Sequence, residues 1–304
     1  MNINLKLLFL VVILLASVAC KTQYSGNPIL PDFQADPSAR VFNDTCWVYP
    51  SHDVAGSKGW DMVDWHTFSS TDLVNWKDHG VIFSLKDITW SKKWAWAPDC
   101  IFRNGKYYFY YPADDQIGVA VSDRPNGPFI DPLQKPLIAR KEGNTRVMDP
   151  NIFIDDDGQA YLYFGNNGLR LVKLKEDMIT RDGEISTLDV KNFHEGVWVF
   201  KRKGLYYVTY PSYFNKKANL LEYSVGKSPY GPFEHKGVII DNNSRNVHHS
   251  IVEIKGKWYL FYHIEGPSPY ERRVCVEYLN FNADGTIKPI KMTNKGVKAI
   301  KLKK

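Results

Sequence analysis

Short runs of aromatic and β-branched residues recur along the chain in pairs that flank a tight turn. Residues 194–210, HEGVWVFKRKGLYYVTY, show the pattern, with an apolar run on either side of Lys203-Gly204. Two such runs joined by a short turn that contains glycine predict a β-hairpin. The same order of polar opening residue, strand, turn and aromatic strand recurs in 36–49, 97–110, 149–163, 195–210 and 248–262. The copies begin roughly 50 residues apart, which is typical of an internal structural repeat.

A second, fainter repeat follows each hairpin and consists of one more strand with a turn or a short outer strand. Residues 119–129, VAVSDRPNGPF, and 223–233, YSVGKSPYGPF, are examples. Each repeat therefore predicts about four strands, and sheets of this size arranged around one axis form a β-propeller. The sequence accordingly predicts an all-β, five-bladed β-propeller. We expect it to fill residues 31–304 as a single domain.

The first residue of the hairpin in each repeat is a candidate functional residue, because these opening positions are equivalent in all five repeats. When the turns are superposed to within one residue, the opening residues are Asp36, Ala97, Asp149, Glu195 and His248. Equivalent positions of a radial repeat lie at equivalent distances from the axis, so three carboxylates and a histidine should converge there. Neighbouring buried acids repel one another, which pushes their pKa values apart and lets one site hold a proton donor and a proton acceptor. The alternative is that each acid only caps its own hairpin.

Three further residues are candidates for a ligand pocket at the mouth of the axis. Trp96 stands next to the small Ala97, and an exposed indole face in such a place suits the apolar face of a sugar ring. His52 and Asp53 follow the first hairpin, at a level where a loop could reach back to the axis. For all three the alternative is ordinary packing.

Two pairs of adjacent residues each offer one candidate. In Arg272-Arg273, an arginine that reached the axis would present a rigid fork of donors, and we expect Arg273 to be the one in the site. The alternative is a solvated surface pair. In His248-His249, the superposed turns select His248, whose neutral imidazole could bind a metal ion or a water on the axis. The alternative is a buried structural histidine.

Composition and charge narrow the class of protein. The chain has 304 residues, of which 44% are hydrophobic and 14% aromatic, so it can bury a large core. Its formal net charge of +6 is modest, and several of its lysines lie in residues 288–304. We therefore expect no nucleic-acid partner.

Residues 1–19 read as a secretory signal, because their apolar run is too short for a membrane-spanning helix. The run ends in ASVAC, residues 16–20, which resembles a bacterial lipobox although Ser17 replaces the usual leucine. This predicts a protein of the cell envelope, facing the periplasm or the cell surface, that is lipid-anchored through Cys20 and tethered by residues 20–30. The alternative is plain secretion.

The three remaining cysteines are Cys46, Cys100 and Cys275. They are odd in number and lack the spacing of a metal site, so we expect buried or free thiols.

The order and spacing of five motifs resemble glycoside hydrolase family 43, whose members are five-bladed propellers that act on arabinose- and xylose-containing polysaccharides. The motifs are NPILPDFQADPS from Asn27, WAWAPD from Trp94, MDPNIFIDDDG from Met148, HEGVWVF from His194 and HHSIVE from His248. The resemblance extends over nearly all of the chain beyond the signal.

The resemblance implies roles for the axial residues. Asp36 would be the general base, Glu195 the general acid, and Asp149 the acid that tunes and orients the proton donor. The implied reaction is a single displacement with inversion, in which the acid protonates the leaving oxygen while the base activates a water. His248 would contact an axial calcium ion or water, and Arg273 would lie near the sugar. No cofactor would be required for the chemistry.

The expected partner is an arabinose- or xylose-containing glycan from plants, from which terminal α-L-arabinofuranosyl or β-D-xylosyl residues would be removed. A membrane would be contacted only through the lipid. The alternatives are a catalytically silent propeller that binds carbohydrate and a scaffold propeller for protein partners.

Overall fold

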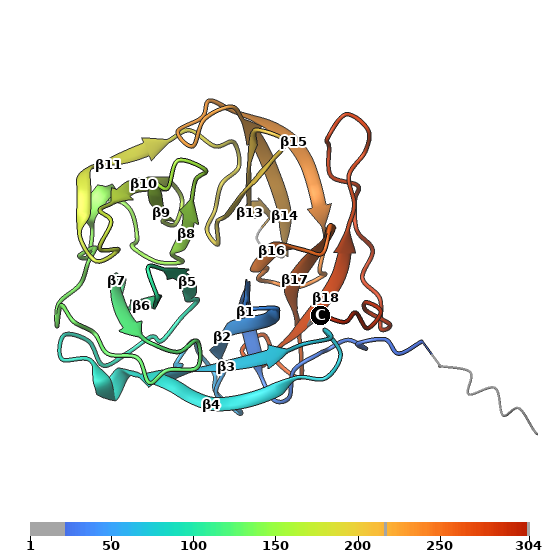
Figure 1. The fold of residues 1–304 in the computed structure, drawn as a ribbon, viewed down its shortest axis with the longest axis horizontal. Helices are drawn as coiled ribbons and strands as arrows, with labels where there is room; N and C mark the ends of the chain where they lie inside the picture. Colours follow the sequence, from blue (N-terminus) through green and yellow to red (C-terminus); the bar gives the residue numbers. More distant parts are fainter. Residues whose placement is uncertain (1–21, 216–217, 303–304) are drawn as a thin grey trace, which may run out of the picture.

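The computed structural model describes residues 22–215 and 218–302 and confirms the predicted five-bladed β-propeller. Figure 1 shows five small sheets arranged in a ring around a central axis. The predicted lipidation site, Cys20, lies outside the described residues. Within the described ranges, no helix is long and apolar enough to cross a membrane.

Each blade is one antiparallel sheet whose strands follow one another in the chain. Blade one contains β1 (Gln34–Phe42), β2 (Thr45–His52), β3 (Asp64–Ser70) and β4 (Lys77–Ser84). Blade two contains β5 (Asp99–Arg103), β6 (Lys106–Ala113) and β7 (Gln116–Ser122), and blade three contains β8 (Asn151–Ile154), β9 (Ala160–Phe164), β10 (Leu169–Leu174) and β11 (Arg181–Leu188). Blade four contains β12 (Trp198–Arg202), β13 (Leu205–Asn215), β14 (Ala218–Gly226) and β15 (Phe233–Ile240), and blade five contains β16 (His249–Ile254), β17 (Lys257–Glu265) and β18 (Arg272–Leu279). The first strand of each blade lies nearest to the axis.

The expectation of about four strands per blade holds for blades one, three and four, whereas blades two and five have three each. In blade two, the segment that would form the outer strand makes only isolated bridges, such as Val121 to Ile130. Prolines occur at 125, 128, 132 and 136 in this segment. Because proline has no N–H to donate to a ladder, this segment cannot form a regular strand.

In blade five, the N-terminal segment lies along the outer side of β18. The N–H of Ile29 donates to the carbonyl of Val274 at 2.8 Å, and the side chain of Asn27 bonds both the carbonyl (3.1 Å) and the N–H (2.9 Å) of Val276. Further out, Tyr24 forms a bridge with Lys298 near the C-terminal end. Residues 24–29 therefore fasten the last blade beside the first, and so close the ring.

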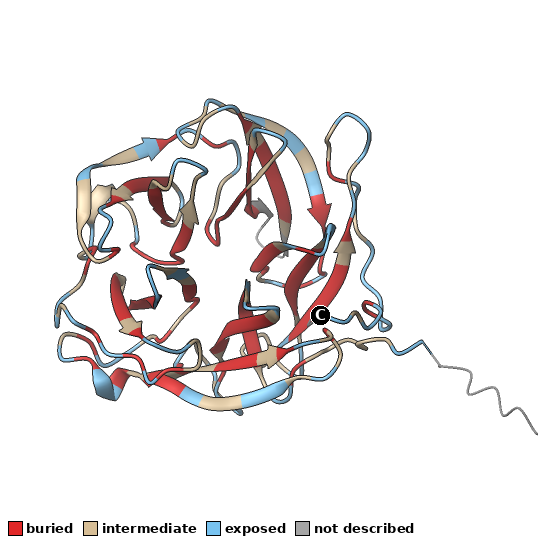
Figure 2. Ribbon diagram, in the orientation of Figure 1, coloured by how far each residue is buried: buried red, intermediate tan, exposed pale blue. Residues whose placement is uncertain are grey.

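The hydrophobic core lies between the blades, since each blade packs both of its faces against its neighbours. Figure 2 shows buried residues on the inner strands and exposed residues on outer strands such as β4 and β15. Strands buried on both faces read as continuous apolar runs, and in β6, KYYFYYPA, only Lys106 is exposed. The predicted buried free thiols are confirmed for Cys46, Cys100 and Cys275.

The inner hairpins use the turns that the sequence indicates. Lys203 and Gly204 both have positive φ angles, of 49° and 75°, and Lys255-Gly256 repeats these values. Two consecutive positive φ angles match the twist of the flanking strands. The turns thereby hold the inner strands at a constant register, and this places the opening residue of each repeat at the same end of the axis.

Asp99 joins three blades at the axis. It is fully buried and accepts hydrogen bonds from Ser38 Oγ (2.6 Å) and Arg40 Nε (3.0 Å) of blade one. On the other side it accepts from Asn151 Nδ2 (3.1 Å) and from the N–H of Ile152 (2.8 Å) of blade three. A buried charge with this many donors is well compensated, so the inner strands have a polar connection as well as an apolar one.

Candidate active site

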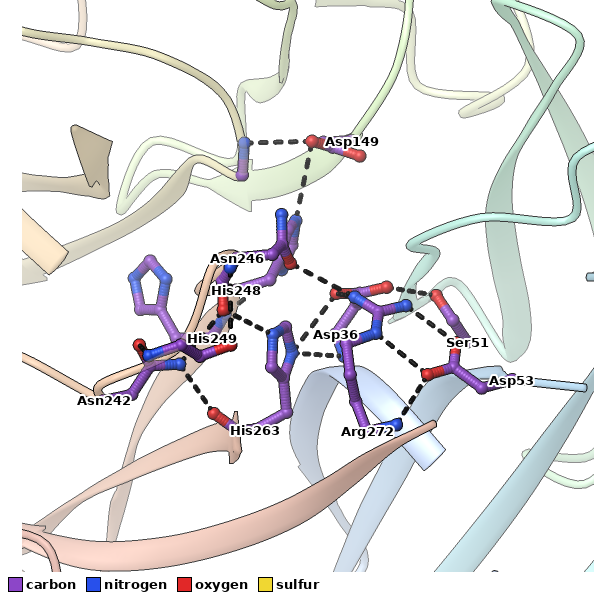
Figure 3. A network of polar contacts seen from close by, with 12 residues as sticks. Asp36, Ser51, Asp53, Asp149, Asn242, Asn246, His248, His249, His263 and Arg272 are labelled. Carbon is purple, nitrogen blue, oxygen red and sulfur yellow. Dashed lines mark hydrogen bonds and ion pairs between the residues drawn. The ribbon is translucent and has the colours of Figure 1, made fainter. Parts of the chain in front are cut away.

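One cavity lies at the end of the axis where the inner strands begin, and it combines acids with aromatic and amide side chains. Its walls are formed by Asp36, Trp60, Met62, Trp96, Ala97, Arg146, Met148, Asp149, Glu195, Asn246, His248 and Arg272. Figure 3 shows several of these side chains converging from different blades. A larger surface groove beside Trp258 and Phe281 has only one acid, Glu253, in its wall, so it offers no pair of carboxylates.

Asp36 enters the cavity from an irregularity in β1. The pairing of β1 with β2 shifts register between Ala35 and Ser38, and Asp36 has a φ of 47°. A bulge of this kind turns a side chain away from the plane of its sheet, and here it directs the carboxylate to the axis. The carboxylate accepts from Ser51 Oγ at 2.6 Å and from a terminal nitrogen of Arg272 at 2.6 Å.

The surroundings of Asp36 keep it ionised. Burial alone would raise the pKa of this carboxyl, but the positive charge of Arg272, together with His263, holds the pKa well below its usual value. The ring of His263 accepts from the Asp36 N–H through Nδ1 (3.1 Å) and donates through Nε2 to the Asn246 carbonyl (3.0 Å). These contacts fix both the charge and the direction of Asp36.

Asp53 holds Arg272 from the side away from the cavity. Its carboxylate accepts from Nε (2.9 Å), from the other terminal nitrogen (2.8 Å) and from the backbone N–H (2.9 Å) of Arg272. The indole of Trp60 covers the guanidinium at 4.5 Å. Asp53 was expected to bind substrate, but it is fully enclosed and acts through Arg272.

The arginine in the site is Arg272 and not the expected Arg273. Arg272 is 2% exposed and lines the cavity, whereas Arg273 is exposed and lies over the ring of Phe33 at 5.5 Å. Successive side chains of a strand point to opposite faces, and β18 begins at Arg272. The repeat pattern did not reveal which of the two faces the axis.

His52 was also expected to line the cavity and does not. Its Nδ1 lies 2.6 Å from an oxygen of Asp64 in the neighbouring strand β3, and its ring lies beside that of His66. The end of β2 therefore directs His52 outward within blade one, while the next residue turns inward to Arg272.

Glu195 stands just before β12 and is held by two amides. One carboxylate oxygen accepts from Asn166 Nδ2 at 2.8 Å, and the other accepts from Asn246 Nδ2 at 2.9 Å. The carbonyl oxygen of the same Asn246 side chain accepts from Arg272 at 3.2 Å. A single amide thus connects Glu195 to the arginine that holds Asp36. Neither asparagine was recognised in the sequence, because both lie in loops outside the repeated hairpins.

Asp149 is close enough to the other two acids to feel their charges, and it has no cationic partner at hydrogen-bond distance among the described residues. One of its oxygens accepts from the N–H of Gly196, the residue after Glu195, at 3.0 Å. A Cβ at Gly196 would lie 2.7 Å from the ring of His248, so only glycine allows this approach. Burial and the negative charges of Glu195 and Asp36 raise the pKa of Asp149 well above its usual value.

His248 completes the cavity wall beside Asp149. Burial lowers the pKa of His248 to about 4, so the imidazole is neutral. Its Nε2 lies 3.8 Å from an oxygen of Asp149 and makes no hydrogen bond with the described residues, although the atom is buried. A neutral, buried nitrogen without a partner in this cavity is suited to a water or a cation.

Trp96 forms the apolar side of the cavity. Its ring stacks on Trp94 at 4.9 Å with an interplanar angle of 13°, and its Nε1 donates to the carbonyl of Trp60 at 2.9 Å. The guanidinium of Arg146 lies over it at 5.3 Å. The indole is therefore held rigidly, as a surface on which a sugar ring can lie needs to be.

Comparison with known proteins gives a consistent picture. A family model described as glycosyl hydrolases family 43 matches residues 25–287. A xylosidase/arabinosidase of Bacteroides ovatus is 36% identical over 315 aligned positions, which cover 84% of this chain and 94% of the relative.

Two solved structures are similar over most of their length. An α-L-arabinofuranosidase from Clostridium thermocellum ATCC 27405 is 42% identical with a TM-score of 0.77, over 86% of this chain and 95% of that one. A β-xylosidase/α-arabinofuranosidase from a compost microbial metagenome, solved with xylotriose in a calcium-free form, is 33% identical with a TM-score of 0.79, over 89% of this chain and 98% of that one.

The raised pKa of Asp149 has a consequence for stability. In the unfolded chain an aspartate loses its proton near pH 3.9, whereas folded Asp149 keeps it to a higher pH. Between these two values the folded state binds more protons, so its stability falls as the pH rises. We expect Asp149→Asn to remove this loss, and to raise the melting temperature at pH 7 by roughly 3 °C for every pH unit between the two pKa values.

Differential scanning calorimetry of both proteins between pH 4 and pH 7 checks this expectation. The gain should be small at pH 4 and should grow with pH. Asp123→Asn serves as the control, since the side chain of Asp123 is 77% exposed and pairs with the exposed Lys106 alone among the residues that the structure describes. A gain that is constant with pH, or one that the control reproduces, contradicts the assignment.

Proposed function

Because the chain belongs to glycosyl hydrolase family 43 and is therefore a glycosidase, we propose that it removes terminal α-L-arabinofuranosyl or β-D-xylosyl residues from plant glycans with inversion. One observation carries the proposal. Asp36, Asp149 and Glu195 come from three different blades, and their side chains line one cavity beside Trp96. Hydrolysis of a glycosidic bond needs such a set of carboxylates around one sugar.

We assign the role of general base to Asp36. The charge of Arg272 lowers the pKa of Asp36, so the carboxylate is ionised at neutral pH and ready to accept a proton from water. Ser51 and Arg272 hold its two oxygens in place. In an inverting enzyme this water attacks the anomeric carbon from the face opposite to the leaving group.

We assign the role of general acid to Glu195. Its two oxygens accept from the neutral amides of Asn166 and Asn246, which fix its direction without supplying a positive charge that would favour ionisation. Asp149 supports it from behind, since its carboxylate binds the backbone N–H of Gly196 directly after Glu195. Asp149 is thus a positioning residue, and its own carboxyl group lies close to the proposed proton donor.

The walls of the cavity support a pentose as the sugar that is bound. Trp60, Met62, Trp96 and Met148 provide apolar surface, and the acids and Asn246 provide hydrogen-bond partners for hydroxyl groups. The names of the relatives include both xylosidase and arabinofuranosidase. We therefore retain both pentoses as substrates, and the assay must compare them.

Substitution of the two acids should separate their roles. On arabinoxylan oligosaccharides, Asp36→Asn and Glu195→Gln should each lower kcat by about 10²- to 10⁴-fold. On nitrophenyl arabinofuranoside or xyloside, Glu195→Gln should lose much less, because nitrophenolate leaves without protonation, whereas Asp36→Asn should lose as much as before. Release of pentose and of chromophore gives the two rates, and NMR of the first product gives the anomer.

The controls for these variants are Asp44→Asn and Glu253→Gln, which change exposed acids remote from the cavity. Circular dichroism establishes that all variants fold. Wild-type rates in either cavity variant would remove that residue from its role. A wild-type protein that binds the oligosaccharides and releases no pentose would instead support a carbohydrate-binding propeller.

We further propose that Nε2 of His248 binds a calcium ion whose other ligands are mainly water molecules. The support is the buried, unpartnered Nε2 in a neutral ring beside the carboxylate of Asp149. Among the described residues His248 belongs to no group of three ligands, and calcium takes six to eight oxygens, so water would have to supply most of them. Nδ1 would give up the hydrogen bond that it accepts from the His249 N–H, at a cost of about 1 kcal/mol. When bound, the ion would add positive charge among the acids.

Removal of the ion should be measurable in stability. After treatment with EDTA, calcium should raise the melting temperature of the wild-type protein, and His248→Ala should not respond. His235→Ala, which changes a histidine paired with Glu222 in blade four, should respond like the wild type. An equal response of His248→Ala, or none from the wild type, contradicts the proposal.

For location, we propose that the protein is attached to the cell envelope by a lipid on Cys20. The support is the apolar leader followed by the lipobox-like ASVAC. In a bacterial host that processes lipoproteins, the wild type should incorporate labelled palmitate and partition into detergent, and Cys20→Ser should do neither. Ser17→Leu, which restores the usual residue, should keep the label. A label that survives in Cys20→Ser contradicts the proposal.

A further inference from the structure

Blade one carries a cluster of two histidines and one aspartate that the proposed reaction does not use. We propose that His52, Asp64 and His66 form a binding site for a transition-metal cation of the zinc type. The proposal is independent of the hydrolytic function, because none of the three side chains lines the axial cavity.

The strands place the three side chains on one side of the sheet. Asp64 and His66 are two residues apart in β3 and therefore point to the same face. His52 ends the neighbouring antiparallel strand β2. The pairing of β3 with β4 shifts register on both sides of His66, but the extra residues lie on β4, so β3 itself keeps its two-residue alternation.

The ligand atoms are close enough for one ion. One oxygen of Asp64 lies 2.6 Å from Nδ1 of His52 and 3.8 Å from Nε2 of His66. One potential ligand atom from each of the three residues lies within 4.8 Å of the others. Ligands of a tetrahedral zinc ion lie about 3.4 Å apart, since the bonds are about 2.0 to 2.2 Å long. Shifts of about an ångström in these side chains would therefore complete three bonds and leave one position for water.

The environment of His66 fits a ligand better than a structural histidine. If Nε2 binds the ion, the hydrogen of the neutral ring is on Nδ1, and a carboxylate oxygen of Asp78 lies 3.9 Å from that atom. A carboxylate behind the second nitrogen is the usual support of a metal-bound histidine. Nδ1 is buried and has no hydrogen bond with the described residues.

The alternative is a simple ion pair between His52 and Asp64. That pair explains the contact at 2.6 Å but not the second imidazole, whose ring centre lies 4.1 Å from that of His52. Asp32 and Asp78 add negative charge close to the cluster. Two imidazoles with one carboxylate suit zinc, and they suit calcium or magnesium poorly.

The site would lie next to the machinery of the cavity. His52 precedes Asp53, the residue that clamps Arg272. An ion bound to His52 and to β3 would fix the end of β2 from which Asp53 projects. Zinc should therefore stabilise the fold as well as bind.

Zinc titration of tag-free, EDTA-stripped protein tests the proposal. Calorimetry at pH 7.5 should give one zinc ion per chain, and Asp64→Asn and His66→Gln should each weaken binding by at least roughly tenfold. His79→Gln is the matched control, because His79 lies in the same blade and, within the described part of the chain, its side chain hydrogen-bonds Ser69 alone. It should bind zinc like the wild type. Binding should also weaken at pH 5.5, because protons compete with the metal ion for imidazole nitrogens.

Two additional measurements keep the result decisive. Melting temperatures without metal show whether each variant is folded, and His52→Gln provides a third ligand variant if another does not fold. Cobalt absorption in the visible range reports the coordination number of the site. Absence of zinc binding by the wild type, or unchanged binding in all three ligand variants, overturns the proposal.

Discussion

The buried guanidinium of Arg272 is the interaction on which the rest of the site depends. It contacts Asp36 and Asp53 directly and is covered by Trp60, with 2% of the residue exposed. A buried charge is tolerated only when it is paired and hydrogen-bonded, and loss of one partner leaves the others uncompensated. The charge of Arg272 therefore lowers the pKa of Asp36 and keeps this carboxylate ionised at the axis. The acids on the other side, Asp149 and Glu195, accept hydrogen bonds from neutral groups, and burial beside other carboxylates raises the pKa of Asp149.

This arrangement ties the chemistry to the closure of the ring. Arg272 is the first residue of β18, and the N-terminal segment holds that strand through Ile29 and Asn27. Asp36 and Asp53 belong to the first blade, and the N–H of Asp53 bonds the carbonyl of Phe33. Asp36 and Arg272 thus lie on opposite sides of the seam between the first and last blades. Only when the ring closes do the two charges meet, so assembly of the site and completion of the fold are one event.

The sequence predicted the parts of the site that belong to the repeat. Because a fixed register places equivalent residues at equal radius, the opening positions identified Asp36, Asp149, Glu195 and His248 as neighbours, and the structure brings all four to one cavity. The same reasoning predicted the number of blades. The prediction of a fourth, outer strand failed in blades two and five. In blade two, prolines prevent a regular strand, and in blade five the N-terminal segment lies where the outer strand was expected.

The remaining errors have a common physical cause. Arg272, Asn166 and Asn246 act from loops or strand ends, where no repeated turn fixes the register and tertiary contacts decide which way a side chain points. Arg273 was chosen over Arg272 although neither had a recognisable buried neighbour that would show which of the two side chains faces the axis. Asp53 and His52 were expected at the cavity because they follow the first hairpin. Asp53 instead contacts Arg272, which is far away in the sequence, and His52 contacts Asp64 in the adjacent strand.

Asn246 shows how the two halves of the cavity are kept at a constant separation. Its amide nitrogen donates to Glu195 and its carbonyl oxygen accepts from Arg272. A flipped amide would place oxygen against a carboxylate and NH₂ against a guanidinium, so only one orientation is stable. Its backbone carbonyl is held in addition by His263, whose other nitrogen accepts from the Asp36 N–H. The protein alone therefore determines the distance between the proposed acid and the proposed base. A site organised in this way needs little rearrangement when a sugar enters, because the groups that must act on opposite faces of the ring are already in place.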